Sequence, residues 1–292
     1  MMKKLYFNML LIAGVALAAC SSDDHGTEQP VYKTYYMTVD ATKGVNEAAN
    51  RMSTRFLELE GNTLNATWAV EEDEEKQEHV YVQGTYKSDG VTKFWFKGSI
   101  KPQYAGTTTR LNGVISLPDG TAYTSIDDAI GTPHTVTLQF PRSGYLDYTG
   151  QIGTLADIAA KYDYAIASDV RVDVEADKVK GVYEVMFENQ QSIVKFTLVD
   201  KADGTTLLNP SALTIQYGET VEDILSLTIP AATYTTNGNG VLFVAIPGFS
   251  GQTVTLTATV GSETYTYTTT SSVTFVNGQY YDIVVEMQKA SN

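Results

Sequence analysis

Cys20 is the only cysteine of the chain, and it carries the clearest chemistry in the sequence. It follows an apolar run over residues 5–19, which begins after two lysines and ends in Leu17-Ala18-Ala19. A thiol becomes a good nucleophile once deprotonated, and small residues before it leave room for a modifying enzyme. The run is shorter than the roughly 20 residues that a membrane-spanning helix needs. The pattern therefore predicts a secretory signal peptide over residues 1–19.

The residues before Cys20 resemble the lipobox of bacterial lipoproteins. This resemblance implies cleavage between Ala19 and Cys20, a diacylglycerol on the cysteine sulfur and a fatty acid such as palmitate on the new amino terminus. Each buried methylene contributes ~0.8 kcal/mol, so one acyl chain anchors a protein only marginally and several anchor it firmly. We therefore expect a protein held on a membrane by its N-terminal lipid.

The polar segment after Cys20 is predicted to be a flexible tether over residues 20–30, because it has no apolar periodicity. Its first part, Ser21-Ser22-Asp23-Asp24, resembles the acidic signal that sends lipoproteins to the outer face of the outer membrane. A solvated linker is the other interpretation. The sequence thus predicts a lipid-anchored protein of the cell outer membrane, exposed on the surface.

The charge of the chain excludes one class of partner. The formal net charge is −14 at pH 7. An acidic chain is repelled by phosphate backbones and by anionic lipid surfaces, so nucleic acid is not an expected partner. The lipid, rather than charge, must hold the protein at the membrane.

Strand-forming patterns dominate the chain and predict an all-β fold. The sequence has 19 tyrosines and is rich in threonine and valine, which fit pleated, half-buried surfaces. Turn residues at Ser88-Asp89-Gly90 and Gly261-Ser262 predict two hairpins. Short apolar runs with a spacing typical of β-sandwiches supply the other strands: residues 32–39, 111–117, 134–141, 170–175, 181–188, 192–200, 213–218, 224–230, 241–248 and 279–288.

One segment departs from the strand pattern and predicts a short helix within residues 155–168. Thr154 precedes it as an N-cap. Apolar residues then recur at helical spacing: Leu155, Ile158, Ala159 and Tyr162.

This helix divides two all-β halves of similar length, which suggests two domains for a chain of this size. We place the boundary at Ser168. The N-terminal domain then covers residues 31–168 and the C-terminal domain residues 169–292.

No residue pattern predicts a catalytic site, a cofactor site or a metal site. His25 lies in the predicted tether, and His79 and His134 have no histidine or cysteine neighbours at zinc-ligand spacing. The acidic run over residues 71–75 lacks the alternating ligands and the central glycine of a calcium loop, so we interpret it as a solvated turn. Glycine loops for phosphate and the motifs of serine or zinc hydrolases do not occur. We therefore assign no catalytic residue from these patterns.

Two tryptophans leave a choice between binding and packing. Trp68 and Trp95 could form a platform on which a sugar ring stacks, but in alternating strands a buried core position is the expected one.

Several phrases resemble the fimbrillin family, the two-domain subunits and accessory proteins of lipoprotein-derived pili. The phrases span most of the chain after Cys20: "STRFLELEGNTLNATWAVEE", "HVYVQGTY", "DYTGQIGTLADIAAKYDYAIAS", "SIVKFTLVD" and "VTFVNGQYYDIVVEMQK". The resemblance implies two β-sandwich domains of transthyretin-like topology, no enzymatic activity and assembly by β-strand donation between subunits. In the family, an arginine-specific protease removes the N-terminal strand, and the strand of another subunit fills the exposed groove.

Arg51 and Arg55 are the candidate cleavage sites that the resemblance implies. They follow the predicted strand at residues 32–39 and the non-strand stretch "ATKGVNEAAN". The alternative is that both are surface arginines of an accessory subunit that is not cut. The donated strand is not identified, although residues 279–288 carry apolar residues on both faces, as a central or a donated strand does.

The sequence thus predicts a surface lipoprotein that is a fimbrial subunit or a fimbrillin-like adhesion protein. A glycan-binding lipoprotein that serves a transporter is the alternative, and an exposed row of aromatic residues on one sheet face would favour it. A secreted hydrolase is a third class, which would need carboxylates that face each other in a deep cleft.

The lipid anchor can be tested by replacing the thiol. We expect Cys20→Ala to release the protein from the membrane and to abolish labelling by a fatty-acid analogue, because no other predicted feature attaches the chain to lipid. Fractionation and labelling of cells measure both effects. Membrane retention equal to that of the wild type would contradict the anchor.

Overall fold

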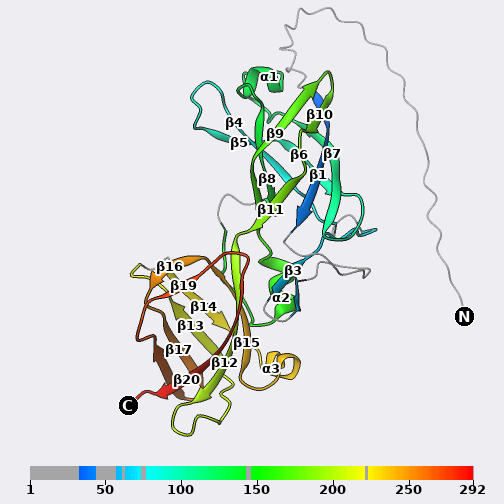
Figure 1. The fold of residues 1–292 in the computed structure, drawn as a ribbon. Coiled ribbons are helices and arrows are strands. Elements are labelled where there is room, and N and C mark those ends of the chain that lie inside the picture. Colours follow the sequence, from blue (N-terminus) through cyan, green and yellow to red (C-terminus); the bar gives the residue numbers. More distant parts are fainter. Residues whose placement is uncertain are drawn as a thin grey trace, which may run out of the picture. The chain divides into compact units, whose positions relative to one another are not determined.

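The computed structural model describes residues 33–43, 57–60, 63–73, 77–142, 146–220 and 223–291. These residues form mainly β-strands, so the predicted all-β fold is confirmed (Figure 1). Within them, no helix combines the length and the apolar character that crossing a bilayer requires. The described ranges contain three short helices rather than the single predicted one: α1 (Ile126–Ala129), α2 (Leu155–Lys161) and α3 (Ala232–Asn237).

The first sheet is assembled from strands between residues 34 and 189. Among the described residues it has nine strands, in the order β5-β4-β8-β9-β10-β1-β7-β6, and β11 pairs with both β1 and β9. A separate hairpin joins β2 (Leu57–Glu60) and β3 (Thr63–Ala66). The strands of the sheet are β1 (Thr34–Lys43), β4 (Tyr81–Thr85), β5 (Lys93–Trp95), β6 (Lys97–Pro102), β7 (Thr108–Ser116), β8 (Thr135–Phe140), β9 (Ala165–Glu175), β10 (Lys178–Gly181) and β11 (Val185–Asn189).

A strand next to one end of this sheet also contacts the strand at the other end. Val80, directly before β4, forms a bridge with Ile100 of β6, and each main chain donates a hydrogen bond to the other at 2.8 and 2.9 Å. Closing a sheet in this way leaves fewer unpaired edges. Apolar and polar residues alternate along strands such as β1 and β4, and the apolar ones are buried, because successive side chains point to opposite faces of a strand.

The second sheet uses the later part of the chain. Its order over the described residues is β14-β13-β17-β18-β20-β12-β15, and β16 (Phe249–Gln252) pairs separately with β19 (Val273–Phe275). The last strand, β20, lies parallel to β12, so the predicted strand at residues 279–288 is a central one. The seven strands are β12 (Gln191–Asp200), β13 (Ala212–Gln216), β14 (Ile224–Thr228), β15 (Val241–Pro247), β17 (Thr255–Val260), β18 (Glu263–Thr268) and β20 (Tyr280–Lys289).

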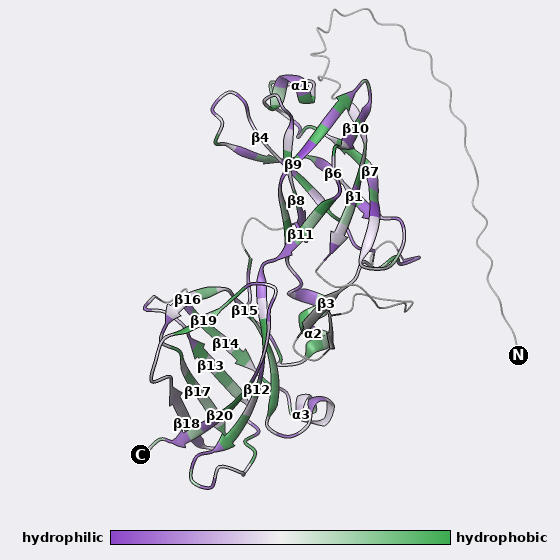
Figure 2. Ribbon diagram, in the orientation of Figure 1, coloured by the Kyte–Doolittle hydropathy of each residue, from purple (hydrophilic) through white to green (hydrophobic). Residues whose placement is uncertain are grey.

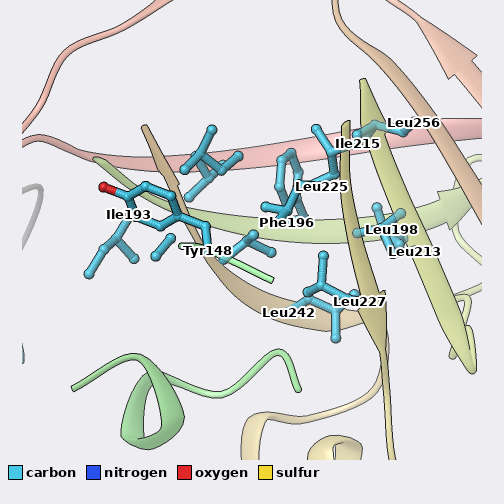
Figure 3. Close-up of a cluster of buried hydrophobic side chains, with 14 of the residues drawn as sticks. Tyr148, Ile193, Phe196, Leu198, Leu213, Ile215, Leu225, Leu227, Leu242 and Leu256 are labelled. Carbon is cyan, nitrogen blue, oxygen red and sulfur yellow. The ribbon is translucent and has the colours of Figure 1, made fainter. Parts of the chain in front are cut away.

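Each sheet encloses its own apolar core. In Figure 2 the hydrophobic colouring runs along the strands, and Figure 3 shows the second core, in which Phe196, Leu198 and Leu213 are fully or almost fully buried. The first core contains β1 side chains together with Trp68 and Phe187. Packing of these side chains supplies most of the favourable free energy of such a fold.

Both predicted hairpins are present. In the first, β4 pairs with β5, and the Asp89 carboxylate accepts hydrogen bonds from the main-chain N–H groups of Val91 and Thr92 at 2.9 and 2.8 Å. In the second, β17 pairs with β18 around Gly261, whose φ of +61° suits glycine.

The predicted helix is shorter than expected. The Thr154 hydroxyl caps α2 by accepting a hydrogen bond from the Asp157 N–H at 3.2 Å, as its position indicated. The helix ends at Lys161, and Ala165 already pairs with Phe140 of β8. Residues 165–168, which the sequence placed in the helix, therefore belong to strand β9.

Sheet membership changes later than the boundary predicted at Ser168. That residue lies inside β9, and the first sheet continues to Asn189, whereas the second begins at Gln191. The division into domains stays a prediction, but pairing places residues 169–189 with the N-terminal strands.

The second core can be tested with a matched pair of leucines. Leu198 is fully buried, whereas Leu207 is 45% exposed. We expect Leu198→Ala to lower the free energy of unfolding by about 2–5 kcal/mol, because it removes buried methylene groups and leaves a cavity. Leu207→Ala should cost about 1 kcal/mol or less. Denaturant unfolding measures both values, and equal losses would contradict the assignment of Leu198 to the core.

Candidate functional site

The candidate site is the position that β1 occupies in the first sheet. β1 is hydrogen-bonded on both edges, antiparallel to β7 along residues 34–42 and parallel to β10 and then β11 on the other side (Figure 1). It is therefore an interior strand, although it lies at the beginning of the described chain. Its removal would leave two separate strand edges without partners.

The inward side chains of β1 are buried at every second position, as its pleat requires. Each of them is at most 1% exposed. The inward row consists of Tyr35, Met37, Val39, Ala41 and Lys43. Four of these are apolar or aromatic and fit a core, whereas the fifth is a lysine, which is rarely buried without a partner.

Tyr35 fixes the N-terminal end of the strand. Its hydroxyl oxygen accepts a hydrogen bond from the main-chain N–H of Ile126, the first residue of α1, at 3.1 Å. Burial raises the pKa of the Tyr35 hydroxyl above its usual range, so it stays protonated. The side chain thus satisfies one of the free N–H groups at the start of a helix.

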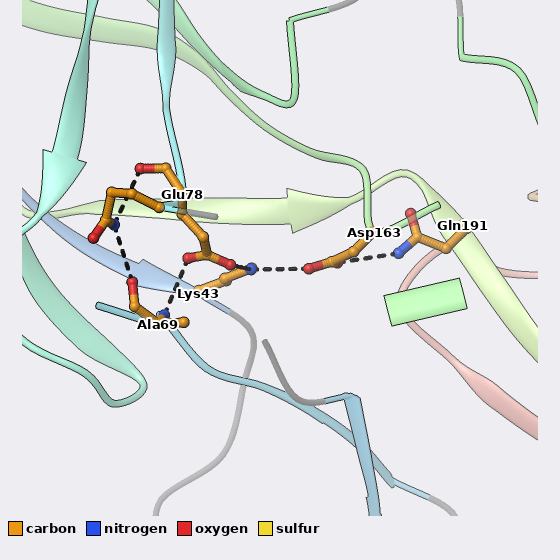
Figure 4. Close-up of polar contacts among 6 residues, drawn as sticks. Lys43, Ala69, Glu78, Asp163 and Gln191 are labelled. Atoms are coloured by element: carbon orange, nitrogen blue, oxygen red, sulfur yellow. Dashed lines mark hydrogen bonds and ion pairs between the residues drawn. The ribbon is translucent and has the colours of Figure 1, made fainter. Parts of the chain in front are cut away.

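Lys43 ends the strand between two carboxylates (Figure 4). Its Nζ lies 2.8 Å from Oδ2 of Asp163 and 3.1 Å from Oε1 of Glu78. Glu78 is fully buried and Asp163 is 6% exposed. Glu78 precedes β4 and Asp163 lies between α2 and β9, so three distant parts of the chain meet at one ammonium group.

The two carboxylates are held by groups that do not belong to β1. Oε2 of Glu78 accepts a hydrogen bond from the Ala69 N–H at 3.1 Å. Oδ1 of Asp163 accepts one from Nε2 of Gln191 at 3.5 Å, which is long for a hydrogen bond. The walls beside the ammonium are aromatic, because Nζ of Lys43 lies 4.5 Å from the ring centre of Phe140 and 5.2 Å from that of Trp68.

The electrostatics of this cluster favour the charged lysine. Burial lowers the pKa of Lys43, but the nearby carboxylates of Asp163 and Glu78 outweigh burial and raise it above its ordinary value. One cation thus faces two acidic groups in surroundings that exclude water. The cluster of Lys43, Glu78 and Asp163, which we call the charge lock, holds the end of β1 in place by ion pairs.

The outward face of β1 is polar and open. Asp40 accepts a hydrogen bond from Nε of Arg110 on β7 at 2.8 Å, and this bond keeps the pKa of the Asp40 carboxyl below its usual range. Tyr36 is 61% exposed. With Lys178 and Lys180 of β10, Tyr36, Asp40 and Arg110 line a surface pocket on the outer face of the sheet.

The residues for which the sequence predicted chemistry fall outside the described residues. These are Ala19, Cys20, Arg51 and Arg55. The predicted strand at residues 32–39 is β1, which continues further, so Ala41, Thr42 and Lys43 belong to the strand rather than to the stretch after it.

The two tryptophans differ. Trp68 is 1% exposed and packs edge-on against Phe187 with ring centres 5.2 Å apart, which confirms its predicted core position. Trp95 is only partly buried, and the Arg142 guanidinium lies 5.6 Å from its ring centre. The expectation that Trp95 is a core residue was wrong. Its sequence neighbours Phe94 and Phe96 are buried, and successive side chains of a strand alternate, so Trp95 faces away from the core.

Histidines do not gather in the part of the chain that the structure describes. Nδ1 of His79 is hydrogen-bonded to the Ser99 hydroxyl at 2.7 Å, and Nε2 of His134 lies 3.2 Å from Oδ1 of Asp127. Within the same residues, no group of three or more histidine, cysteine or acidic side chains is arranged to hold a metal ion.

Sequence reasoning missed the Lys43 cluster. A lysine in phase with the inward apolar residues of a strand was a readable signal for a buried charge. Its partners Glu78 and Asp163 are 35 and 120 residues further along the chain, and no local pattern connects them.

Comparison with solved structures gives matches over most of the chain. A fimbrial protein of Bacteroides ovatus is 10% identical, with 89% of this chain and 50% of that one covered and a TM-score of 0.34. A suspected cell adhesion protein of the same species is 17% identical, with 89% and 97% covered and a TM-score of 0.39. A fimbrial assembly protein of Parabacteroides distasonis is 11% identical, with 86% and 90% covered and a TM-score of 0.39.

These three structures are a fimbrial protein, a suspected cell adhesion protein and a fimbrial assembly protein. This chain spans half the length of the first of them. No protein-family model matches the sequence, and the search of curated proteins found no match.

The charge lock can be tested with two lysines of different burial. Lys43→Met leaves two buried acidic groups without their cation, and we expect it to lower the free energy of unfolding by about 3–5 kcal/mol. Lys97 pairs with Asp119 at 2.9 Å, but both side chains are more than half exposed. Lys97→Met should therefore cost about 1 kcal/mol or less. Similar losses in denaturant unfolding for the two variants would contradict the lock.

Proposed function

We propose that this chain is a non-enzymatic surface lipoprotein that acts as a fimbrial subunit or a fimbrillin-like adhesion protein. It is anchored in the cell outer membrane through Cys20 and associates with other subunits by β-strand donation. The observation that carries the proposal is the position of β1, an early segment that is nevertheless an interior strand of the first sheet.

The groove that β1 fills is suited to accept another strand. Without β1, main-chain groups of β7 on one side and of β10 and β11 on the other lose their hydrogen-bond partners. Unpaired main-chain groups that are shielded from water are costly. Burying side chains such as Met37 and Val39 contributes ~1.5–3 kcal/mol each. An incoming strand would restore both contributions, with main-chain bonds for affinity and side-chain pockets for selection.

The order of features along the chain supports exchange at this position. The acylated Cys20 precedes β1, and the candidate cleavage sites Arg51 and Arg55 follow it. One cut after either arginine would therefore separate both the lipid and β1 from the remaining chain. The subunit would lose its membrane anchor in the same step that opens its groove. In the alternative of an uncut accessory subunit, β1 and the anchor both remain.

A glycan-binding lipoprotein receives less support. Three tyrosines of the described chain are more than half exposed: Tyr36 (61%), Tyr104 (52%) and Tyr183 (70%). Only Tyr36 lies in a strand, so these residues do not form an aromatic row on one sheet face.

A hydrolase receives no support from the buried carboxylates. Glu78 and Asp163 are both ion-paired with Lys43, and Asp157 is ion-paired with Lys161. These carboxylates hold lysines and do not form a pair across a cleft, as a glycosidase would need.

Limited proteolysis tests the exchange. We expect an arginine-specific protease to cut the purified full-length protein after Arg51 or Arg55 and to produce ladders of non-covalent oligomers, because the opened grooves take up strands from neighbouring molecules. Size-exclusion chromatography with mass spectrometry of the new N-terminus measures both events.

The double variant Arg51→Ala, Arg55→Ala is the matched control and should stay intact in this segment and monomeric. If the wild type is cut there and remains monomeric at high protein concentration, strand exchange is wrong, and the role of an uncut accessory subunit is favoured.

A further inference from the structure

We propose that the β1 groove selects its occupant by charge: an incoming strand must carry a basic residue at the register position of Lys43, eight residues after a tyrosine at the position of Tyr35. This inference rests on the proposed strand exchange and deepens it, because it states the chemistry of the partner. The partner is an extended segment with inward side chains in the order tyrosine, three apolar residues and lysine.

The cation site at the end of the groove is built by residues that remain when β1 leaves. Glu78 and Asp163 supply the two carboxylates, and neither belongs to β1. Phe140 of β8 and Trp68 supply the aromatic walls. β1 contributes only the ammonium group. The site is therefore a preformed receptor for a cation, and the strand that fills the groove has to provide it.

A strand without this cation would bind the groove more weakly. It would leave the buried carboxylates of Glu78 and Asp163 without the ammonium group that pairs with both, and removing one partner of a buried ion pair is strongly unfavourable. The Glu78 carboxylate is also held in place by the hydrogen bond from the Ala69 N–H, and Asp163 has a weaker, long contact with Gln191. An apolar residue at the last inward position therefore does not substitute for lysine, even though the groove is otherwise apolar.

The two polar ends of the row also define register and direction. The Tyr35 hydroxyl reaches the N–H of Ile126 at one end, and Lys43 reaches its carboxylates at the other. A slip by one residue would turn the whole inward row outward. A slip by two residues would move the cation by roughly 7 Å, out of ion-pair distance. A strand inserted in the opposite direction would present its tyrosine to the carboxylates.

The same spacing occurs once more in the sequence, in the last strand. β20 contains Tyr281, Ile283, Val285, Met287 and Lys289, which match Tyr35, Met37, Val39, Ala41 and Lys43 in type and order. In this molecule β20 is paired with β12 and β18. Its sequence nevertheless provides a second, independent segment with the required pattern, and it can be used as a probe.

Peptide uptake by the cut protein tests the inference. The full-length protein is cut at Arg51 or Arg55 and incubated with fluorescent, amidated peptides that compete with its own β1. The probes are residues 33–47 of this chain, the same peptide with Lys43→Met, and the same peptide with Asp40→Asn. The last is the matched control, because it also removes one charge, but on the outward face. A further pair is residues 279–292 with and without Lys289→Met.

We expect the Lys43→Met peptide to bind at least about a hundredfold more weakly than the native peptide, by analogy with other buried charge pairs that lose one partner. The Asp40→Asn peptide should bind within about threefold of the native one, since exposed ion pairs contribute little. The Lys289→Met change should weaken uptake of the β20 peptide in the same way. In an acceptor with Glu78→Gln and Asp163→Asn, checked for its fold by circular dichroism before cutting, the preference for lysine should disappear.

The outcomes separate this inference from the function on which it rests. If the lysine and methionine peptides bind the wild-type acceptor equally, selection by charge is wrong and strand exchange stands. If the preference for lysine persists in the Glu78→Gln, Asp163→Asn acceptor, the cluster is not its cause and the inference is wrong. If the native peptide itself is not taken up, strand exchange at this groove is wrong, and the inference is overturned with it.

Discussion

The double pairing of β1 is the constraint on which the first sheet depends. β1 bonds to β7 on one edge and to β10 and β11 on the other, and these partners come from residues 108–116 and 178–189. The sheet is therefore completed only when an early segment and a much later one have both been positioned. Contacts between residues so far apart require loop closure before they stabilise the fold.

The buried lysine adds specificity to this arrangement at a cost in stability. An apolar residue at the last inward position of β1, facing apolar partners, would fill the core without desolvating three charged groups. The observed cluster instead makes the end of the strand depend on Glu78 and Asp163, which lie on other elements. Buried polar groups can fix register where apolar packing alone tolerates slippage, and we attribute that role to Lys43.

In the proposed function, the lipid anchor, the exchangeable strand and the candidate cleavage sites follow one another along the chain, and this order would link location to assembly. A chain that keeps β1 keeps its connection to Cys20, whereas a chain cut after Arg51 or Arg55 retains neither. Under that proposal, a single proteolytic step would convert a membrane-anchored subunit into a released one.

The sequence by itself determined the local features of this protein. Alternating apolar residues predicted the strands, Asp89-Gly90 and Gly261 predicted the hairpins, and Thr154 predicted the start of α2, because each depends on neighbours within a few residues. The tertiary structure alone decided which strands pair, and it placed residues 169–189 in the first sheet, because pairing joins segments that share no local signal. It also decided which face of β5 holds Trp95. For the same reason it alone revealed that Lys43, an ordinary lysine in the sequence, lies between Glu78 and Asp163: a buried ion pair is a property of distances between remote residues, and those distances exist only once the chain has folded.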